Sequence, residues 1–348
     1  MPAPGFARRV VRWQHAHGRH DLPWQQDRDP YRVWLSEVML QQTQVATVRG
    51  YYARFLQRFP DLRSLAVAPL DDVLALWSGL GYYSRARNLH RCAQQLCAQH
   101  DGRFPRSSAE LARLPGIGRS TAAAIAAICF GERVSILDGN VRRVLARSLG
   151  FGADLARPAN VQALWRQAQA LVPARDVAAY TQGLMDLGAL VCSARRPDCA
   201  RCPLAPVCVA HAQGRPEAYP VKARRGARGR RCAALLWLVH GDRHWLVQRP
   251  AHGVWAGLWS LPEAESVAHW QQPLQVWPGS GEALPPIEHA LTHFDWTLAP
   301  LRWRLPARIG AARLQALTAQ LPAGRWLSTA EALQVALPAP VRRLLAAG

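Results

Sequence analysis

The spacing of apolar residues along this chain changes near residue 231, and that change limits the fold more than any other feature. From Tyr31 to about Leu190, apolar residues recur at threes and fours between Gly and Pro residues, a period typical of amphipathic helices. After the change, Cys232–Val239 and His244–Gln248 flank the sequence HGDR, which predicts two strands and a hairpin turn. A length of 348 residues also suits about two domains. We therefore expect an all-α domain followed by a mixed α/β domain.

The expected elements place a boundary between these domains. A stretch over 214–231, rich in Gly, Pro and Arg, reads as a basic linker between a helical domain at 1–213 and an α/β domain at 232–348. The second domain should also contain a strand at 298–305 and helices at 314–320 and 341–346. The first should contain helices at 31–48, 70–80, 84–100, 109–114, 120–130, 141–149, 161–172 and 177–190.

Charge points to a polyanionic partner. The chain holds 43 Lys and Arg against 23 Asp and Glu, a net charge of +20. Such an excess attracts nucleic acid. The alternative, a GC-rich genome that prefers Arg to Lys, explains the choice of Arg but not the shortage of acidic residues. No apolar run approaches the about 18 residues that span a bilayer, and the first residues lack the apolar core of a secretory leader. We expect a cytoplasmic protein with no membrane contact.

Four of the eight cysteines lie close together in the sequence. Cys192, Cys199, Cys202 and Cys208 have the spacing C-x6-C-x2-C-x5-C, which in a reducing compartment suits a metal centre better than disulfides. Zinc and a [4Fe–4S] cluster both use four thiolates, and the single C-x2-C pair between longer gaps favours the iron–sulfur cluster. The remaining cysteines, Cys92, Cys97, Cys129 and Cys232, are expected to be buried small hydrophobic residues.

Two glycines mark a turn that can hold a phosphate. In LPGIGRSTA, residues 114–122, Gly116 and Gly118 permit a tight turn with free N–H groups, followed by a helix N-terminus. The pattern resembles the hairpin of a helix-hairpin-helix motif, although any helical hairpin can need glycine. Asp138 follows in ILDGNVRRVLA, just before a helix, where an ordinary N-cap is the alternative to a catalytic role.

A second carboxylate stands on an apolar stripe. At helical spacing, Glu37 has Val33, Trp34, Leu40 and Gln41 as neighbours. Removal from water should raise the pKa of this carboxyl and favour the protonated form that a general acid needs. The alternative is a glutamate on a helix surface.

With these features in order, the chain resembles the MutY-type adenine DNA glycosylases. The resemblance covers nearly the whole chain and rests on SEVMLQQTQV (36–45), GLGYYSRARNL (79–89), LDGNV (137–141) and YTQGLMDLGA (180–189), together with the cysteine cluster. It implies a helix-hairpin-helix glycosylase core with a [4Fe–4S] loop at 192–208, followed by a Nudix-like domain. It also implies a monomer that acts on double-stranded DNA and removes adenine mispaired with 8-oxoguanine or guanine.

The resemblance carries residue roles to matching positions. Glu37 would protonate the flipped adenine, Asp138 would stabilise the oxocarbenium-like sugar, and Asn140 would support them. The matches expected to contact substrate or DNA are Arg19, Trp24, Leu40 and Gln182 around the adenine, Gln42 and Tyr82 in the duplex, and Gly116 and Gly118 at a phosphate.

Ser120 separates this chain from its strand-cleaving relatives. Bifunctional glycosylases with this hairpin carry a lysine there, which forms a Schiff base, and serine cannot form one. A monofunctional enzyme is expected. The alternatives are an endonuclease III-type glycosylase/lyase on damaged pyrimidines and a non-catalytic iron–sulfur DNA-binding protein.

The second domain begins with a Nudix-like sequence, GLWSLPE at 257–263. The acidic helix that binds magnesium in Nudix hydrolases has no counterpart, because residues 264–281 hold Glu265 as their single acid. Hydrolysis of nucleotides is therefore not expected. The resemblance implies that Leu291, Thr292 and His293 form a loop that recognises 8-oxoguanine. Thr292 keeps a hydroxyl that many relatives supply with serine, whereas Leu291 replaces an aromatic residue.

Overall fold

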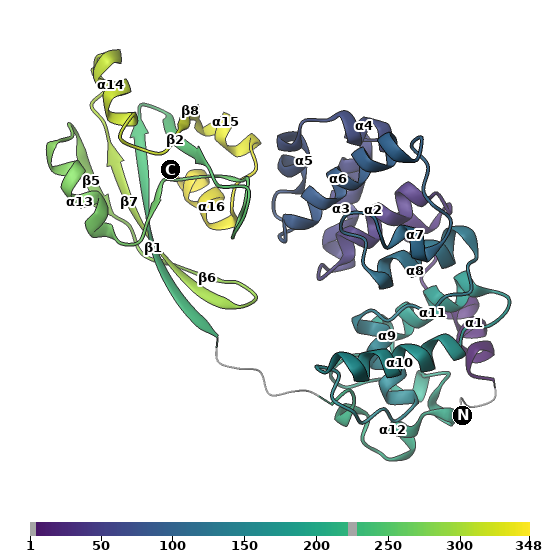
Figure 1. Ribbon diagram of the computed structural model, residues 1–348. Helices are drawn as coiled ribbons and strands as arrows, with labels where there is room; N and C mark the ends of the chain where they lie inside the picture. The colour runs from purple at the N-terminus through teal and green to yellow at the C-terminus, as the bar shows by residue number, and fades with distance from the viewer. Residues whose placement is uncertain (1–4, 222–227) are drawn as a thin grey trace. The chain divides into compact units, whose positions relative to one another are not determined.

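The chain folds into two compact units, described by a computed structural model at residues 5–221 and 228–348 (Figure 1). The first unit combines residues 1–67 with 88–225, and the second combines residues 68–87 with 226–348. Part of the expected linker, residues 222–227, lies outside the described residues. No helix in the described ranges has both the length and the apolar character needed to cross a membrane.

The first unit is helical, as the period of its apolar residues predicts. Helix α6 (Ser84–Gln99) extends across the boundary between the units. Short 3-10 turns, η1 to η4, lie at Pro23–Gln25, Cys199–Arg201, Ala205–Val207 and Pro216–Ala218. The other helices of the unit are α1 (Phe6–His17), α2 (Pro30–Leu40), α3 (Val45–Arg58), α4 (Leu62–Val67), α7 (Ser108–Leu111), α8 (Arg119–Phe130), α9 (Gly139–Ser148), α10 (Pro158–Ala170), α11 (Val177–Leu190) and α12 (Val209–Ala212).

Helix α11 is central to the core that positions the candidate site. Its buried Leu187 packs in one cluster with Val10 of α1 and Val144 of α9. Gly183 allows α1 to approach closely, since a Cβ there would lie 2.8 Å from Val10 Cγ1. Burial of such apolar side chains contributes about 1.5–3 kcal/mol each, so the core fixes these helices relative to one another.

The helix expected at 31–48 is not continuous, so this prediction is wrong. The stretch 31–48 covers most of helix α2 and the beginning of helix α3, and a turn at residues 41–44 separates the two helices. Gln42 takes a left-handed conformation there, with φ of 59°. The sequence contains no Gly or Pro at this turn, so its apolar spacing gave no sign of the break. The result is that Gln42 lies at a sharp bend instead of on a helix face.

The second unit is built on a mixed sheet, which confirms the expected α/β class. Its strands follow the order β3-β2-β1-β7-β5, with β4 on β1, β6 on β7 and β8 on β2. Strands β1 and β7 are parallel, with Leu235 opposite Pro300, and the other pairs are antiparallel. The strands are β1 (Gly229–His240), β2 (Arg243–Gln248), β3 (Trp259–Ser260), β4 (Glu263–Ala264), β5 (Ser280–Ala283), β6 (Ile287–Ala290), β7 (Phe294–Arg304) and β8 (Gly324–Ser328).

Helices cover both faces of this sheet because β1 alternates its buried side chains. Leu235 and its alternate neighbours pack with Val341 of α16, whereas Leu236 and its neighbours pack with Trp270 of α13. The unit's helices are α5 (Leu70–Trp77), α13 (Val267–Val276), α14 (Ala311–Thr318), α15 (Thr329–Gln334) and α16 (Ala339–Ala347).

The start of this sheet differs from the expectation in two ways. Strand β1 begins at Gly229, so the last residues of the expected linker belong to the sheet. Cys232 is exposed rather than buried, because the first residues of β1 extend beyond the packed part of the sheet. The expected hairpin between β1 and β2 is confirmed, with Val239 opposite His244.

Candidate active site and cysteine cluster

A pocket of about 280 Å³ in the first unit contains several of the candidate residues. Glu37 enters it from α2 and Gln182 from α11. Arg19 follows the end of α1, and Trp24 belongs to η1. Helices α1 and α11 pack against each other in the core. This packing brings Arg19 and Gln182 to the same pocket, although they are 163 positions apart in the sequence.

Glu37 has the altered acidity expected from its apolar stripe. Its side chain is partly buried where it lines the pocket, and Val38 and Ser36 beside it are buried. Burial raises the pKa of Glu37 to about 7, and the negative charge of Asp138 adds to the rise. Near neutral pH a substantial fraction of this carboxyl therefore keeps its proton.

Asp138 caps helix α9, which is the structural role weighed as its alternative. Its Oδ1 accepts a hydrogen bond of 2.7 Å from the Val141 N–H. Burial raises the pKa of Asp138, while the N–H groups of Val141 and Asn140 and the charge of Arg143 act in the opposite direction. These donors favour the anion at Asp138, whereas burial and the Asp138 charge favour the acid at Glu37. Burial thus raises the pKa of both carboxyls, and only Asp138 has backbone N–H donors that oppose the rise.

The glycine turn forms the expected entry to helix α8. Gly116 has φ of 75°, and a Cβ there would lie 2.5 Å from the Asn88 Cβ, so glycine is required. Gly118 is the N-cap of α8. Ser120 Oγ accepts a 3.1 Å hydrogen bond from the Leu137 N–H, one residue before Asp138. The start of α8 therefore anchors the segment that presents Asp138.

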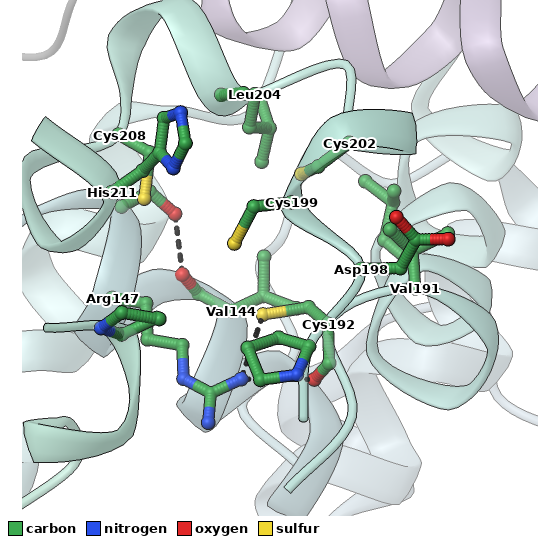
Figure 2. Close-up of a pocket in the computed structure, with 15 residues that line it drawn as sticks. Val144, Arg147, Val191, Cys192, Asp198, Cys199, Cys202, Leu204, Cys208 and His211 are labelled. Atoms are coloured by element: carbon green, nitrogen blue, oxygen red, sulfur yellow. Dashed lines mark hydrogen bonds between the residues drawn. The ribbon is translucent and has the colours of Figure 1, made fainter. Parts of the chain in front are cut away.

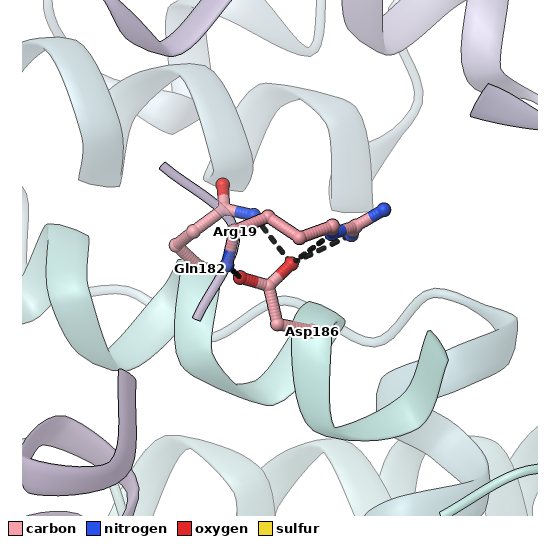
Figure 3. Close-up of polar contacts among 3 residues, drawn as sticks. All are labelled: Arg19, Gln182 and Asp186. Carbon is pink, nitrogen blue, oxygen red and sulfur yellow. Dashed lines mark hydrogen bonds and ion pairs between the residues drawn. The ribbon is translucent and has the colours of Figure 1, made fainter. Parts of the chain in front are cut away.

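Asp186, which is not part of the pocket lining, accepts hydrogen bonds from two residues that are, Arg19 and Gln182 (Figure 3). Its side chain is fully buried and accepts from the Arg19 backbone N–H at 2.9 Å and from Arg19 Nε at 2.7 Å. An ion pair of 2.6 Å links Arg19 Nη2 to the same carboxylate. Gln182 Nε2 donates to Asp186 Oδ1 at 2.9 Å. The sequence reasoning named Arg19 and Gln182 but not Asp186, which lies four residues after Gln182 on α11.

Gln25 is a second pocket residue that sequence reasoning missed. Both polar atoms of its amide are buried, and neither has a hydrogen-bond partner among the described residues. A buried amide in that state is costly unless a ligand or water pairs with it. Nothing in the sequence PWQ at 23–25 distinguishes this amide from one on a surface, so only the folded pocket reveals it.

Three of the residues predicted for catalysis or for contact with the adenine lie outside the lining of this pocket. Leu40, Asp138 and Asn140 do not belong to that lining. Leu40 is the last residue of α2, one turn beyond Glu37, and Asp138 and Asn140 lie at the start of α9. Asp138 still acts on Glu37 through its charge, so the two carboxyls share one electrostatic environment.

The four clustered cysteines surround a separate cavity beside α9 and the end of α11 (Figure 2). All four are free thiols, and burial raises the pKa of Cys202 to about 11. Within the described parts of the chain, no three His, Cys, Asp or Glu side chains gather closely enough to hold a single metal ion. The four thiols that line this one cavity are a soft donor set, of the type that iron–sulfur clusters use. The cavity lining includes Cys192, Cys199, Cys202 and Cys208.

Two arginines of α9 hold the first cysteine in place. Arg147 is buried and donates to Cys192 Sγ at 3.3 Å and to the Ser193 carbonyl at 2.6 Å. Arg143 donates to the Cys192 carbonyl at 2.8 Å and to Asn140 Oδ1 at 2.9 Å. Helix α9 therefore has Asp138 as its N-cap and contacts the cysteine loop through Arg143 and Arg147, five and nine residues after Asp138.

The second unit contains its own pocket, of about 490 Å³, where residues 79–87 meet the loop after β6. Leu291, Thr292 and His293 line it, as does Tyr82. Tyr82 is 46% exposed, has a left-handed φ of 49°, and places its hydroxyl 3.3 Å from Thr292 Oγ1. The Tyr82 ring is thus partly exposed at the pocket wall, with the Arg85 guanidinium carbon 5.6 Å from its centroid.

Comparison with known proteins identifies the family. Residues 35–168 match the HhH-GPD superfamily of base excision DNA repair proteins, and residues 233–347 match the NUDIX domain. An adenine DNA glycosylase of Buchnera aphidicola subsp. Acyrthosiphon pisum is 33% identical, over 98% of this chain and 96% of its own length. The chain belongs to the adenine DNA glycosylase family. Another member, from Rattus norvegicus, is 35% identical over 97% of this chain and 77% of the rat protein.

A solved structure has a similar fold over part of the chain. A thermostable thymine-DNA glycosylase is 27% identical, with a TM-score of 0.54, over 60% of this chain and 95% of that chain. Membership in the adenine DNA glycosylase family confirms the resemblance drawn from the sequence motifs, and with it the helix-hairpin-helix core followed by a Nudix-like domain. The roles of the individual site residues remain predictions.

Proposed function

We propose that this chain removes adenine mispaired with 8-oxoguanine or guanine from double-stranded DNA, by hydrolysis of the N-glycosidic bond. The observation that carries the proposal is Glu37, whose pKa is raised to about 7 at the wall of a pocket large enough for a purine. An acid that keeps its proton near neutral pH can protonate a leaving base. Membership in the adenine DNA glycosylase family supports adenine as that base.

The two carboxyls divide the chemistry. Glu37 donates its proton to the flipped adenine as the bond between C1′ and N9 breaks, and the bonding electron pair leaves with the base. Asp138, whose Oδ1 accepts the Val141 N–H, stabilises as a carboxylate the positive charge that develops on the sugar. Water then adds at C1′ and returns a proton to Glu37. The products are free adenine and an intact strand with an abasic site.

Strand cleavage is not part of the proposed reaction. Schiff-base chemistry needs an amine at the sugar, and the hairpin position carries Ser120, whose hydroxyl accepts the Leu137 N–H. The enzyme is therefore monofunctional. This distinguishes the proposal from an endonuclease III-type glycosylase/lyase on damaged pyrimidines.

Cys192, Cys199, Cys202 and Cys208 would hold a [4Fe–4S] cluster. Four iron–thiolate bonds would supply a rigid cross-link for the loop between α11 and α12. Arg147 supports this assignment, because it donates a hydrogen bond to Cys192 Sγ, and hydrogen bonds to the sulfurs are typical of iron–sulfur sites. The protein's own share of this arrangement is the packing of the loop against α9 through Arg143 and Arg147.

The 8-oxoguanine is recognised in the second unit. Thr292 and His293 are exposed at the wall of its pocket, and Tyr82 reaches Thr292. Hydroxyl groups at this position can donate to the oxygen that distinguishes 8-oxoguanine from guanine. Leu291 supplies apolar contact without an aromatic ring.

The test is base release from a duplex with adenine opposite 8-oxoguanine, analysed with and without alkali. Strand breaks that need alkali would support a monofunctional adenine glycosylase, and breaks without alkali would contradict it. Glu37→Gln should abolish release while DNA binding persists, which separates catalysis from binding alone. A duplex with thymine in place of the adenine is the matched control, and release of thymine from it would contradict the choice of base.

A further inference from the structure

Asp186 is a fully buried charge behind the pocket wall, outside the pocket lining. Four donors satisfy it: the Arg19 backbone N–H, Arg19 Nε, Arg19 Nη2 and Gln182 Nε2. Both oxygens are occupied as acceptors, because Oδ2 accepts from the Arg19 backbone N–H and Oδ1 accepts from Gln182 and pairs with the Arg19 guanidinium at 2.6 Å. Asp186 therefore accepts hydrogen bonds and has none to donate.

This fixes the direction of the Gln182 amide. A glutamine amide can turn over to exchange its oxygen and nitrogen, but only the NH₂ group can face an ionised carboxylate. Gln182 Nε2 lies 2.9 Å from Asp186 Oδ1, and the amide oxygen points away from Asp186 (Figure 3). Because Gln182 lines the pocket with Glu37, its wall presents an acceptor at this point.

We propose that Asp186 is a positioning residue that locks the Gln182 amide with its oxygen toward the pocket, so that the pocket selects a purine with an exocyclic amino group. The inference rests on the proposed function and adds the means by which the base is chosen. Adenine attached to DNA has one set of N–H donors, the amino group at C6. Hypoxanthine has the same ring but an oxygen at C6, which would meet the Gln182 oxygen as acceptor against acceptor.

Asp186→Asn removes the lock and keeps the shape of the side chain. The asparagine can donate as well as accept, so Gln182 can turn its NH₂ group toward the pocket and pair with the C6 oxygen of hypoxanthine. The intrinsic stability of the N-glycosidic bond of adenine or of hypoxanthine does not depend on whether the wild-type protein or Asp186→Asn is used. A change in the ratio of the two release rates therefore reports the pocket alone.

The experiment measures single-turnover release of adenine and of hypoxanthine, each opposite 8-oxoguanine in the same duplex. An unpaired or opposed buried polar group costs about 5- to 100-fold in rate, and we expect Asp186→Asn to lower the adenine-to-hypoxanthine ratio by about that factor. Asp186→Glu, which keeps the acceptor, should retain the preference. Gln169→Met is the matched control, because Gln169 bridges Ser135 N and the Arg133 carbonyl in the same unit, and its loss should leave the ratio unchanged.

A double variant shows whether Asp186 acts through Gln182. In a Gln182→Leu background, Asp186→Asn should change the ratio by less than about 2-fold, since the amide to be positioned is gone. An equal loss of both rates in Asp186→Asn, with the ratio preserved, would show a structural role only and overturn the inference. If that variant does not fold, Gln182→Leu decides: a full wild-type ratio in it would also overturn the inference. Failure of the wild-type enzyme to release adenine would instead refute the proposed function.

Discussion

Replacing Glu37 by Gln should stabilise the protein at alkaline pH while it destroys activity. Burial and the charge of Asp138 raise the pKa of Glu37 from 4.5 to about 7. In the unfolded chain this carboxyl loses its proton near pH 4.5, whereas the folded protein holds the proton until about pH 7. The stability that the protonated group contributes is therefore complete below pH 4.5 and is lost as the pH rises through 7. Glutamine has a similar shape and never ionises, so it escapes the loss.

The size of the effect follows from the same values. Each tenfold change in an ionisation equilibrium is worth about 1.4 kcal/mol, so the rise of the Glu37 pKa to about 7 corresponds to about 3 kcal/mol at pH 8. At pH 5 the difference should be below about 1 kcal/mol. For a unit of this size, about 3 kcal/mol raises the melting temperature by about 6–12 °C.

The assay compares thermal unfolding of the wild-type protein and Glu37→Gln at pH 5 and pH 8. Glu265→Gln, which changes an exposed glutamate, is the control and should show no pH-dependent difference. In the same samples, base release should fall by about 10²- to 10⁴-fold in Glu37→Gln. Wild-type release should decrease about tenfold per pH unit above pH 7. Equal melting differences at pH 5 and pH 8 would refute the argument from burial, and release within tenfold of wild type would refute the role as acid.

Three further predictions concern the anchors of the two sites. Ser120→Ala leaves the Leu137 N–H without its acceptor, so thermal unfolding should report a loss of about 1–2 kcal/mol, and the rate of base release should fall; unchanged values of both would contradict the anchoring role. Arg147→Lys cannot keep the bonds to the sulfur and carbonyl oxygens of the cysteine loop, so the purified variant should contain less iron per chain than wild type and unfold at a lower temperature. Tyr82→Phe removes the hydroxyl contact to Thr292, so affinity for a duplex with 8-oxoguanine should drop by about 2- to 5-fold while affinity for undamaged duplex is kept, as measured by titration.

The fold was predictable where the signal is local. Helix α11 spans Val177–Leu190 as the apolar period predicts, and the turn between β1 and β2 lies where the sequence places Gly241. The break between α2 and α3 escaped prediction because a glutamine, and not a Gly or Pro, takes the left-handed conformation at this turn. Helix α1 lies before the first residue of the predicted helical pattern and was missed, although its packing against α11 builds the pocket.

In the candidate site too, the features that depend on neighbours in the sequence were predictable, and those that depend on distant residues were not. The raised pKa of Glu37 could be expected because its apolar neighbours lie within one helical turn. The Asp186 ion pair could not, since its partner Arg19 lies 167 residues away in the chain. Gln25 is a similar case: an amide without partners is visible only when every surrounding atom is in place. Residues that act through distant partners are therefore the ones that a single sequence leaves out.

Ser120 shows how the structure can change the meaning of a correct sequence argument. The sequence explains the residue by what it lacks, an amine for Schiff-base chemistry. The structure adds what it provides, an acceptor for the Leu137 N–H just before Asp138. A lysine has no acceptor in its side chain, so Ser120→Lys would introduce an amine and release the Asp138 segment in the same step. Residue 120 thus bears on the placement of Asp138, the carboxylate proposed for catalysis, as well as on the presence of an amine.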